Sequence, residues 1–84
     1  MTERIEYPLV MVSWRDAASN ASWVEMDELP VPVNVQTVGY LVLEKPDYIV
    51  VCGTYSDHEH SPFSESIAIP SAWTNSVQRL TKEV

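Results

Sequence analysis

Three stretches of this chain carry apolar residues at consecutive positions, where a sheet with one wet face would alternate apolar and polar side chains. They are residues 9–12, 40–43 and 48–52. Unbroken apolar runs of this length indicate strands of which both faces need cover. A chain of 84 residues forms one small domain, residues 1–84, and has little material for a second layer. We therefore expect a mainly β domain with an apolar face left over.

The leftover apolar face predicts self-association, because a second copy of the chain can cover what the first copy cannot. Tyr48 and Val50 are the expected interface residues, and a homo-oligomer is the expected state. The alternative is a monomer in which a short helix and the segment after Pro70 cover the same face.

The order of elements predicts five strands. The first is expected over residues 9–14, and a hairpin is expected from residues 36–43 and 48–55 around the turn at 44–47, where Pro46 and Asp47 suit a turn. Gly39 marks a bend or a bulge, at which the strand can curve into a small barrel. A fourth strand, residues 63–69, is expected to end at Pro70, followed by one helical turn. Residues 74–80 fit either a fifth strand or a terminal helix.

A short helix is expected between the first two strands. Ser22 and Glu25 have the spacing of a capping box, which predicts a helix within residues 23–29. Pro30 and Pro32 end it, because proline lacks the amide hydrogen that a helix requires.

The charge balance disfavours polyanionic partners. Lys and Arg number 5 against 12 Asp and Glu, which gives a net charge of -7. Phosphate neutralisation needs more cations than this chain has, which disfavours nucleic acid and anionic membrane as partners. The single Cys52 lies among apolar residues and allows no internal disulfide, and no apolar run approaches the roughly 20 residues of a spanning helix. We expect a soluble cytoplasmic protein.

A resemblance adds to these expectations. Residues 14–17, Trp23, residues 37–41 and residues 67–70 together resemble short tailed-bacteriophage proteins without an established activity. The resemblance implies a phage origin and the host cell cytoplasm as the location. The order of elements is also similar to that of five-stranded Sm-like and SH3-like barrels, which implies a strongly bent barrel and a possible ring of subunits.

The Sm-like comparison also bears on RNA binding. Gly39, Leu41 and Glu44 match the strand that leads to the RNA-contacting loop of that family. The Asn that follows in the family is absent from residues 45–48, and Pro70-Ser71 stands where the family carries Arg-Gly. These departures disfavour RNA binding.

Two constellations could carry chemistry. Trp14, Asp16, Trp23 and Tyr40 could line a pocket between subunits that holds a planar, nucleotide-like ligand. The alternative is that Asp16 caps a loop while the two tryptophans are core or interface anchors, which we favour.

His58 and His60 have the spacing of a metal-binding pair, with Asp57 or Glu59 as further ligands. We favour a solvated loop there, because no third histidine completes the set.

No motif of a hydrolase or nucleotide-dependent enzyme is present, so no catalytic residue and no cofactor is predicted. The leading hypothesis is a non-catalytic oligomeric β-barrel, an accessory interaction module whose partner is a host or phage protein. The second is a small-molecule binding or sequestering protein, and the third is a metal-dependent site at the two histidines.

Overall fold

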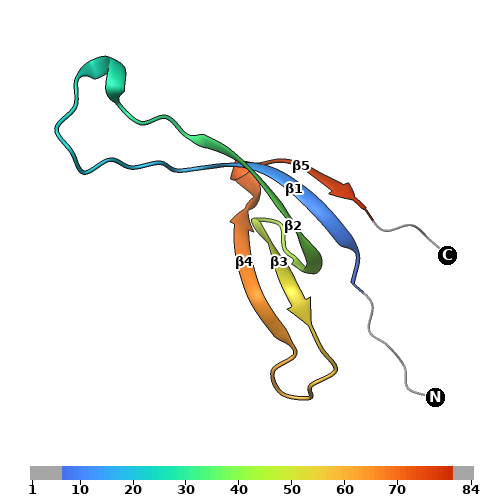
Figure 1. Ribbon diagram of the computed structural model, residues 1–84. Helices are drawn as coiled ribbons and strands as arrows, with labels where there is room; N and C mark the ends of the chain where they lie inside the picture. The colour runs from blue at the N-terminus through green and yellow to red at the C-terminus, as the bar shows by residue number, and fades with distance from the viewer. Residues whose placement is uncertain (1–6, 81–84) are drawn as a thin grey trace.

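The computed structural model describes residues 7–80, which form one five-stranded antiparallel sheet (Figure 1). The strand order is β4-β3-β2-β1-β5. The strands are β1 (Leu9–Asp16), β2 (Val33–Glu44), β3 (Tyr48–Tyr55), β4 (Phe63–Pro70) and β5 (Thr74–Arg79), and two short 3-10 helices are η1 (Met26–Glu28) and η2 (Ser71–Trp73). The mainly β fold is thereby confirmed.

The long strand β2 joins the two halves of the sheet. Its first part pairs with β1 and its last part pairs with β3, and Tyr40 faces Leu9 in one ladder and Cys52 in the other. A Cβ at Gly39 would lie 2.6 Å from Val51 Cγ1 and 2.7 Å from the Cys52 carbonyl oxygen. Glycine is therefore required here by close approach of the next strand.

The sequence predicted either a bend or a bulge at Gly39. The bulge of β2 does not lie at Gly39. The pairing with β1 runs regularly through Gly39, and the register shifts between Leu41 and Leu43 in the ladder with β3. The extra residue is therefore Val42, directly after the point where β2 changes partner. A bulge there lets the strand turn as it leaves β1.

The hairpin between β2 and β3 is confirmed, with Lys45 N–H donating to the Tyr48 carbonyl oxygen at 2.9 Å. The fourth strand ends at Pro70 and one helical turn follows, both as expected. The segment after that turn is a strand, because β5 pairs with β1 through Val12 and Val77.

The core lies on one face of the sheet. Its members are Val10, Val12, Trp14, Ile49, Val51 and Ile69, all buried. The Trp14 indole N–H donates to Thr37 Oγ1 at 3.0 Å, so the one polar atom of this side chain has a partner. Trp14 is thus a core anchor, as one of the two interpretations of the sequence held.

The two outermost strands do not pair with each other. In the described range β4 is paired with β3 and β5 with β1, and η2 connects them while it contacts β1 and β3. The sheet is therefore open in one chain, and closure into an Sm-like or SH3-like barrel stays a prediction.

A short helix does lie within residues 23–29, as predicted, but it does not begin at the expected Ser22 capping box. Only η1, three residues long, is helical, and it covers no part of the sheet. The Ser22 N–H bonds to Asn20 Oδ1 at 2.9 Å in a local turn, and the carboxylate that reaches back belongs to Glu28, 3.3 Å from the Glu25 N–H. So few residues before Pro30 cannot offset the cost of nucleating an α-helix without packing.

Candidate interaction surface

The side of the sheet away from the core, which we call the outer face, is also apolar. Strand alternation and register place Met11, Val38, Leu43, Tyr48 and Val50 on it. Val38 is 56% exposed, and Leu43 is also exposed. Within residues 7–80 Val38 and Leu43 therefore lack the cover that apolar side chains require, while Met11, Tyr48 and Val50 are half-buried.

Tyr48 and Val50, the predicted interface residues, alternate along β3 with the buried Ile49 and Val51. Both are half-buried by neighbours within the sheet. Val50 pairs with Leu43 of β2 and with Ala68 of β4. The two residues are therefore placed where a second copy could contact them, and their role in an interface stays a prediction.

A second exposed apolar surface lies on the connection between β1 and β2. This connection, residues 17–32, is called the arm; it projects away from the sheet at the upper left of Figure 1. Trp23 is 103% exposed, and Met26, Leu29 and Val31 are exposed as well. The tryptophan contributes nothing to the core of its own chain.

The dimensions of the molecule reflect the projecting arm. The Cα radius of gyration is 16.6 Å and the extents are 63 × 27 × 21 Å. A compact domain of this length has a radius of gyration of about 12 Å. The chain by itself is therefore much more extended than a globular monomer of its size.

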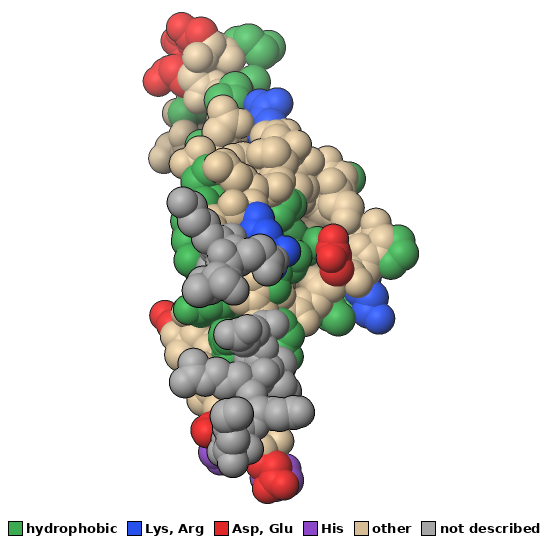
Figure 2. Space-filling model, turned by 90° about the vertical axis from the view of Figure 1, so that its right-hand side faces the viewer, with side chains coloured by type: hydrophobic (Ala, Val, Ile, Leu, Met, Phe, Trp, Pro, Cys, Tyr) green, Lys and Arg blue, Asp and Glu red, His purple; other side chains and the backbone are tan. Residues whose placement is uncertain are grey.

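The tip of the arm is acidic. Glu25, Asp27 and Glu28 are exposed, and one carboxylate oxygen of each lies within 4.8 Å of the others. In Figure 2 acidic side chains occupy both ends of the long axis, at the arm tip and beside the two histidines. The three charges at the tip repel one another and are tolerated because water solvates them.

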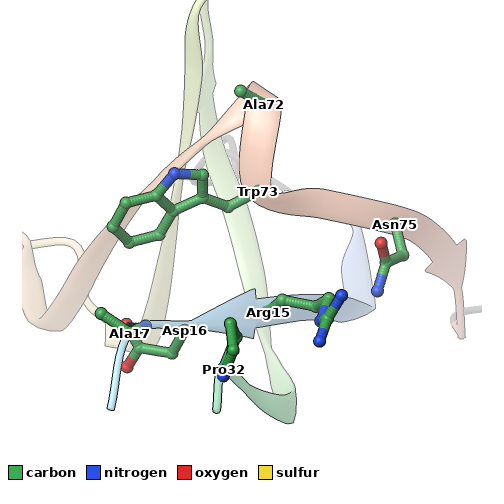
Figure 3. A pocket seen from close by; sticks show the side chains of 7 residues that line it. All are labelled: Arg15, Asp16, Ala17, Pro32, Ala72, Trp73 and Asn75. Atoms are coloured by element: carbon green, nitrogen blue, oxygen red, sulfur yellow. Dashed lines mark hydrogen bonds between the residues drawn. The ribbon is translucent and has the colours of Figure 1, made fainter. Parts of the chain in front are cut away.

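An open cavity lies where the arm leaves the sheet (Figure 3). Its volume is about 350 Å³, and it is lined by Arg15, Asp16, Ala17, Pro32, Ala72, Trp73 and Asn75. The Trp73 ring extends over the end of β1, while Arg15 and Asn75 lie on the other side of the cavity. The cavity thus combines an aromatic surface, a cation and a carboxylate.

Of the four residues predicted to line a ligand pocket, the structure of one chain places only Asp16 at this cavity. Its Oδ1 accepts the Ala17 N–H at 2.8 Å, which is the loop-capping role named as the alternative. Trp14 is buried in the core, and Trp23 lies on the arm. A pocket formed between subunits would require the arm of another copy.

Tyr40, the fourth of these residues, belongs to an aromatic cluster at the far end of β3. Its ring meets that of Tyr55 at a centroid distance of 4.8 Å, and Tyr7 contacts both Tyr55, at 5.1 Å, and Phe63, at 5.7 Å. All three pairs are edge-to-face, the favourable arrangement of aromatic rings. The cluster tethers Tyr7 to the hairpin of β3 and β4.

Sequence reasoning singled out only Asp16 among the residues that line the cavity, and the aromatic residue that it missed is Trp73. It lies in η2, which the chain brings against β1 from a position far away in the sequence. The only local signal was an aromatic residue in a single helical turn after Pro70, which does not by itself indicate a cavity.

The two histidines lie in the exposed loop between β3 and β4. His58 Nδ1 accepts backbone N–H groups from His60, at 3.3 Å, and Ser61, at 3.1 Å, so this nitrogen holds the turn together. Glu59 lies 3.8 Å from His60 Nε2. Over residues 7–80, three metal-ligating side chains converge only at the arm tip, not here. The two histidines thus lie in an exposed, hydrogen-bonded loop, and a metal site there stays a prediction.

Cys52 is buried, and burial raises the pKa of its thiol because the surroundings disfavour the charged thiolate. A buried thiol with a raised pKa is a poor nucleophile. Cys52 therefore behaves as a small apolar residue between β2 and β4.

Comparison with protein-family models, with curated proteins and with solved structures finds no match for this chain. None of the helices in the described range is long and apolar enough to span a bilayer. The two apolar surfaces and the cavity are therefore the features on which a functional interpretation rests.

Proposed function

We propose that this protein is a non-catalytic, homo-oligomeric β module that acts as an accessory interaction protein. The observation that carries the proposal is the uncovered outer face, apolar along β1, β2 and β3 in a sheet of one layer. A phage origin, with a host or phage protein as the further partner, belongs to the same proposal.

The energetics support self-association. At about 25 cal/mol per Å², burial of a few hundred Å² of the outer face contributes several kcal/mol. The whole folding stability of a domain of this size is of the same order. An assembly that covers Val38 and Leu43 would therefore supply a large share of the stability of each subunit.

Native mass spectrometry at low micromolar concentration tests this proposal, because one spectrum reports subunit number and any retained ligand. The wild-type protein is expected as a defined oligomer without extra mass. Val50→Glu and Tyr48→Glu are expected to dissociate it, since a carboxylate buried without a partner costs several kcal/mol. Ser61→Glu, in the exposed loop, is the matched control and keeps the wild-type mass. A wild-type monomer refutes the proposal.

A second candidate function has its own observation, the cavity at the base of the arm. The Trp73 ring can stack on a planar group, and Arg15, which forms no ion pair within residues 7–80, can bind a phosphate or carboxylate. A small-molecule binding protein would then use this surface, completed by another subunit.

The two candidates separate in the same spectrum. A ligand retained by the wild-type protein and lost from Arg15→Gln, with an unchanged subunit number, supports the binding protein. That ligand should also raise the melting temperature of the wild type but not of the variant. An oligomer without extra mass, whose melting temperature a panel of nucleotides leaves unchanged, argues against it.

A further inference from the structure

We infer that the arm, residues 17–32, docks on the outer face of a second copy of this chain, so that subunits exchange arms. The inference rests on the proposed self-association and names the segment that mediates it. Its starting point is that Trp23 and Met26 of the arm are almost fully exposed, although both carry large apolar side chains.

The arm is too apolar to be a solvated loop. Trp23, Met26, Leu29 and Val31 together present on the order of 500 Å² of apolar surface, since one aromatic side chain alone contributes roughly 150–250 Å². Solvent-exposed connections are ordinarily rich in polar residues and glycine. In this arm proline and apolar residues fill the stretch that leads into β2 instead.

A second copy of the chain is the partner for which the buried area of arm and outer face matches that of a stable interface. Every copy carries one arm and one outer face, so a symmetric pair buries two of each. Two arms contribute about 1,000 Å² and the surfaces that they cover about as much, which reaches the roughly 1,200–2,000 Å² of stable interfaces. An anionic membrane fits poorly, because Glu25, Asp27 and Glu28 lie next to the tryptophan at the tip.

The geometry of the chain favours exchange over folding back. The ladder between β1 and β2 ends at the pair Asp16 and Val33. This pair holds the two ends of the arm together where the two strands end. From there the arm leads away from the sheet (Figure 1). Pro30 and Pro32 hold the part of the arm that leads into β2 in an extended conformation.

Two variants test the inference by sedimentation velocity and native mass spectrometry. Trp23→Ala is expected to weaken self-association by roughly 30-fold, as loss of a central aromatic anchor does. Val77→Ala is the control, because Val77 is exposed, pairs with Val12 in β1 and lies outside the arm and the cavity, and it should leave association unchanged. Far-ultraviolet circular dichroism confirms that both variants remain folded.

A cross-linking experiment identifies the acceptor. p-Benzoylphenylalanine in place of Trp23, in a co-refolded mixture of ¹⁵N-labelled and unlabelled chains, should join the arm to peptides that contain Val38 or Val50. About half of the cross-links should combine a labelled with an unlabelled chain, as random pairing of copies requires. Cross-links only within one chain overturn the arm exchange.

The outcomes separate this inference from the proposed function. An oligomer that Trp23→Ala leaves intact refutes the arm exchange and preserves the proposed self-association. A wild-type monomer refutes both.

Discussion

Replacement of Gly39 by alanine is the sharpest test of the β2 geometry. The added Cβ would lie 2.6 Å from Val51 Cγ1 and 2.7 Å from the carbonyl oxygen of Cys52, both well inside van der Waals contact. The methyl of Val51 could rotate away, but the carbonyl is part of the β2–β3 ladder and moves only with its strand. Overpacking of this kind costs up to about 3 kcal/mol.

A second effect opposes the clash. Alanine reduces the conformational entropy of the unfolded chain, which stabilises the folded state by about 0.4–1 kcal/mol where the native backbone conformation suits alanine. The net loss at Gly39 is therefore about 2 kcal/mol, which lowers the melting temperature by roughly 10 °C in a domain of this size. Urea denaturation followed by tryptophan fluorescence and circular dichroism, at fixed protein concentration, measures it.

Gly53→Ala is the matched control within the neighbouring strand. Its Cβ would lie 3.2 Å from Glu65 Oε1, which is the flexible end of an exposed side chain, and 3.3 Å from Glu65 Cβ, which needs to shift by only a few tenths of an ångström. The expected change in unfolding free energy is within about 0.5 kcal/mol. If Gly39→Ala is as stable as wild type, or if both substitutions destabilise equally, the close approach of β2 and β3 is not what requires glycine.

Two further predictions concern the core. Thr37→Val removes the acceptor of the Trp14 indole N–H and should cost about 1 kcal/mol in urea denaturation, whereas Thr54→Val, which loses only an exposed hydrogen bond to Glu65, should cost much less. Because burial raises the pKa of Cys52, the native thiol should react with a disulfide reagent far more slowly than the denatured one. Because of the raised pKa, the Cys52 thiol of the folded protein stays protonated at pH values at which the thiol of the unfolded chain is ionised. The contribution of Cys52 to stability is therefore complete below about pH 8.5 and lost as pH rises through the folded-state pKa, and Cys52→Val should remove this loss.

Local chemistry predicted the strands well. Some boundaries carried their own signal, as with Pro46 and Asp47 in the turn and Pro70 at the end of β4, whereas β1 and β2 extend beyond the predicted residues 14 and 36, to Asp16 and Val33. The choice between strand and helix for β5 could not be made locally, because it depends on pairing with β1 across most of the chain. The spacing of Ser22 and Glu25 was misleading for a related reason. A capping signal starts a helix only where the following residues have something to pack against.

The candidate site depends even more on distant contacts. Asp16 was singled out from the sequence and does line the cavity, but Trp73 reaches it only because η2 connects β4 to β5 across the end of β1. The outer face, by contrast, was predictable from unbroken apolar runs such as residues 48–52, since alternation necessarily sends half of them away from the core.

The pairing of β1 with β5 has a consequence for the order in which the protein folds during synthesis. Val10 is paired with Arg79, so one edge of β1 stays open while the ribosome adds almost all of the residues between them. The sheet from β1 to β4 can assemble earlier, because its ladders join strands that are neighbours in the chain. An unpaired edge next to apolar side chains is the feature by which nascent chains aggregate. β1, made first, is therefore the last strand to gain its second neighbour, and it needs protection until β5 has left the exit tunnel.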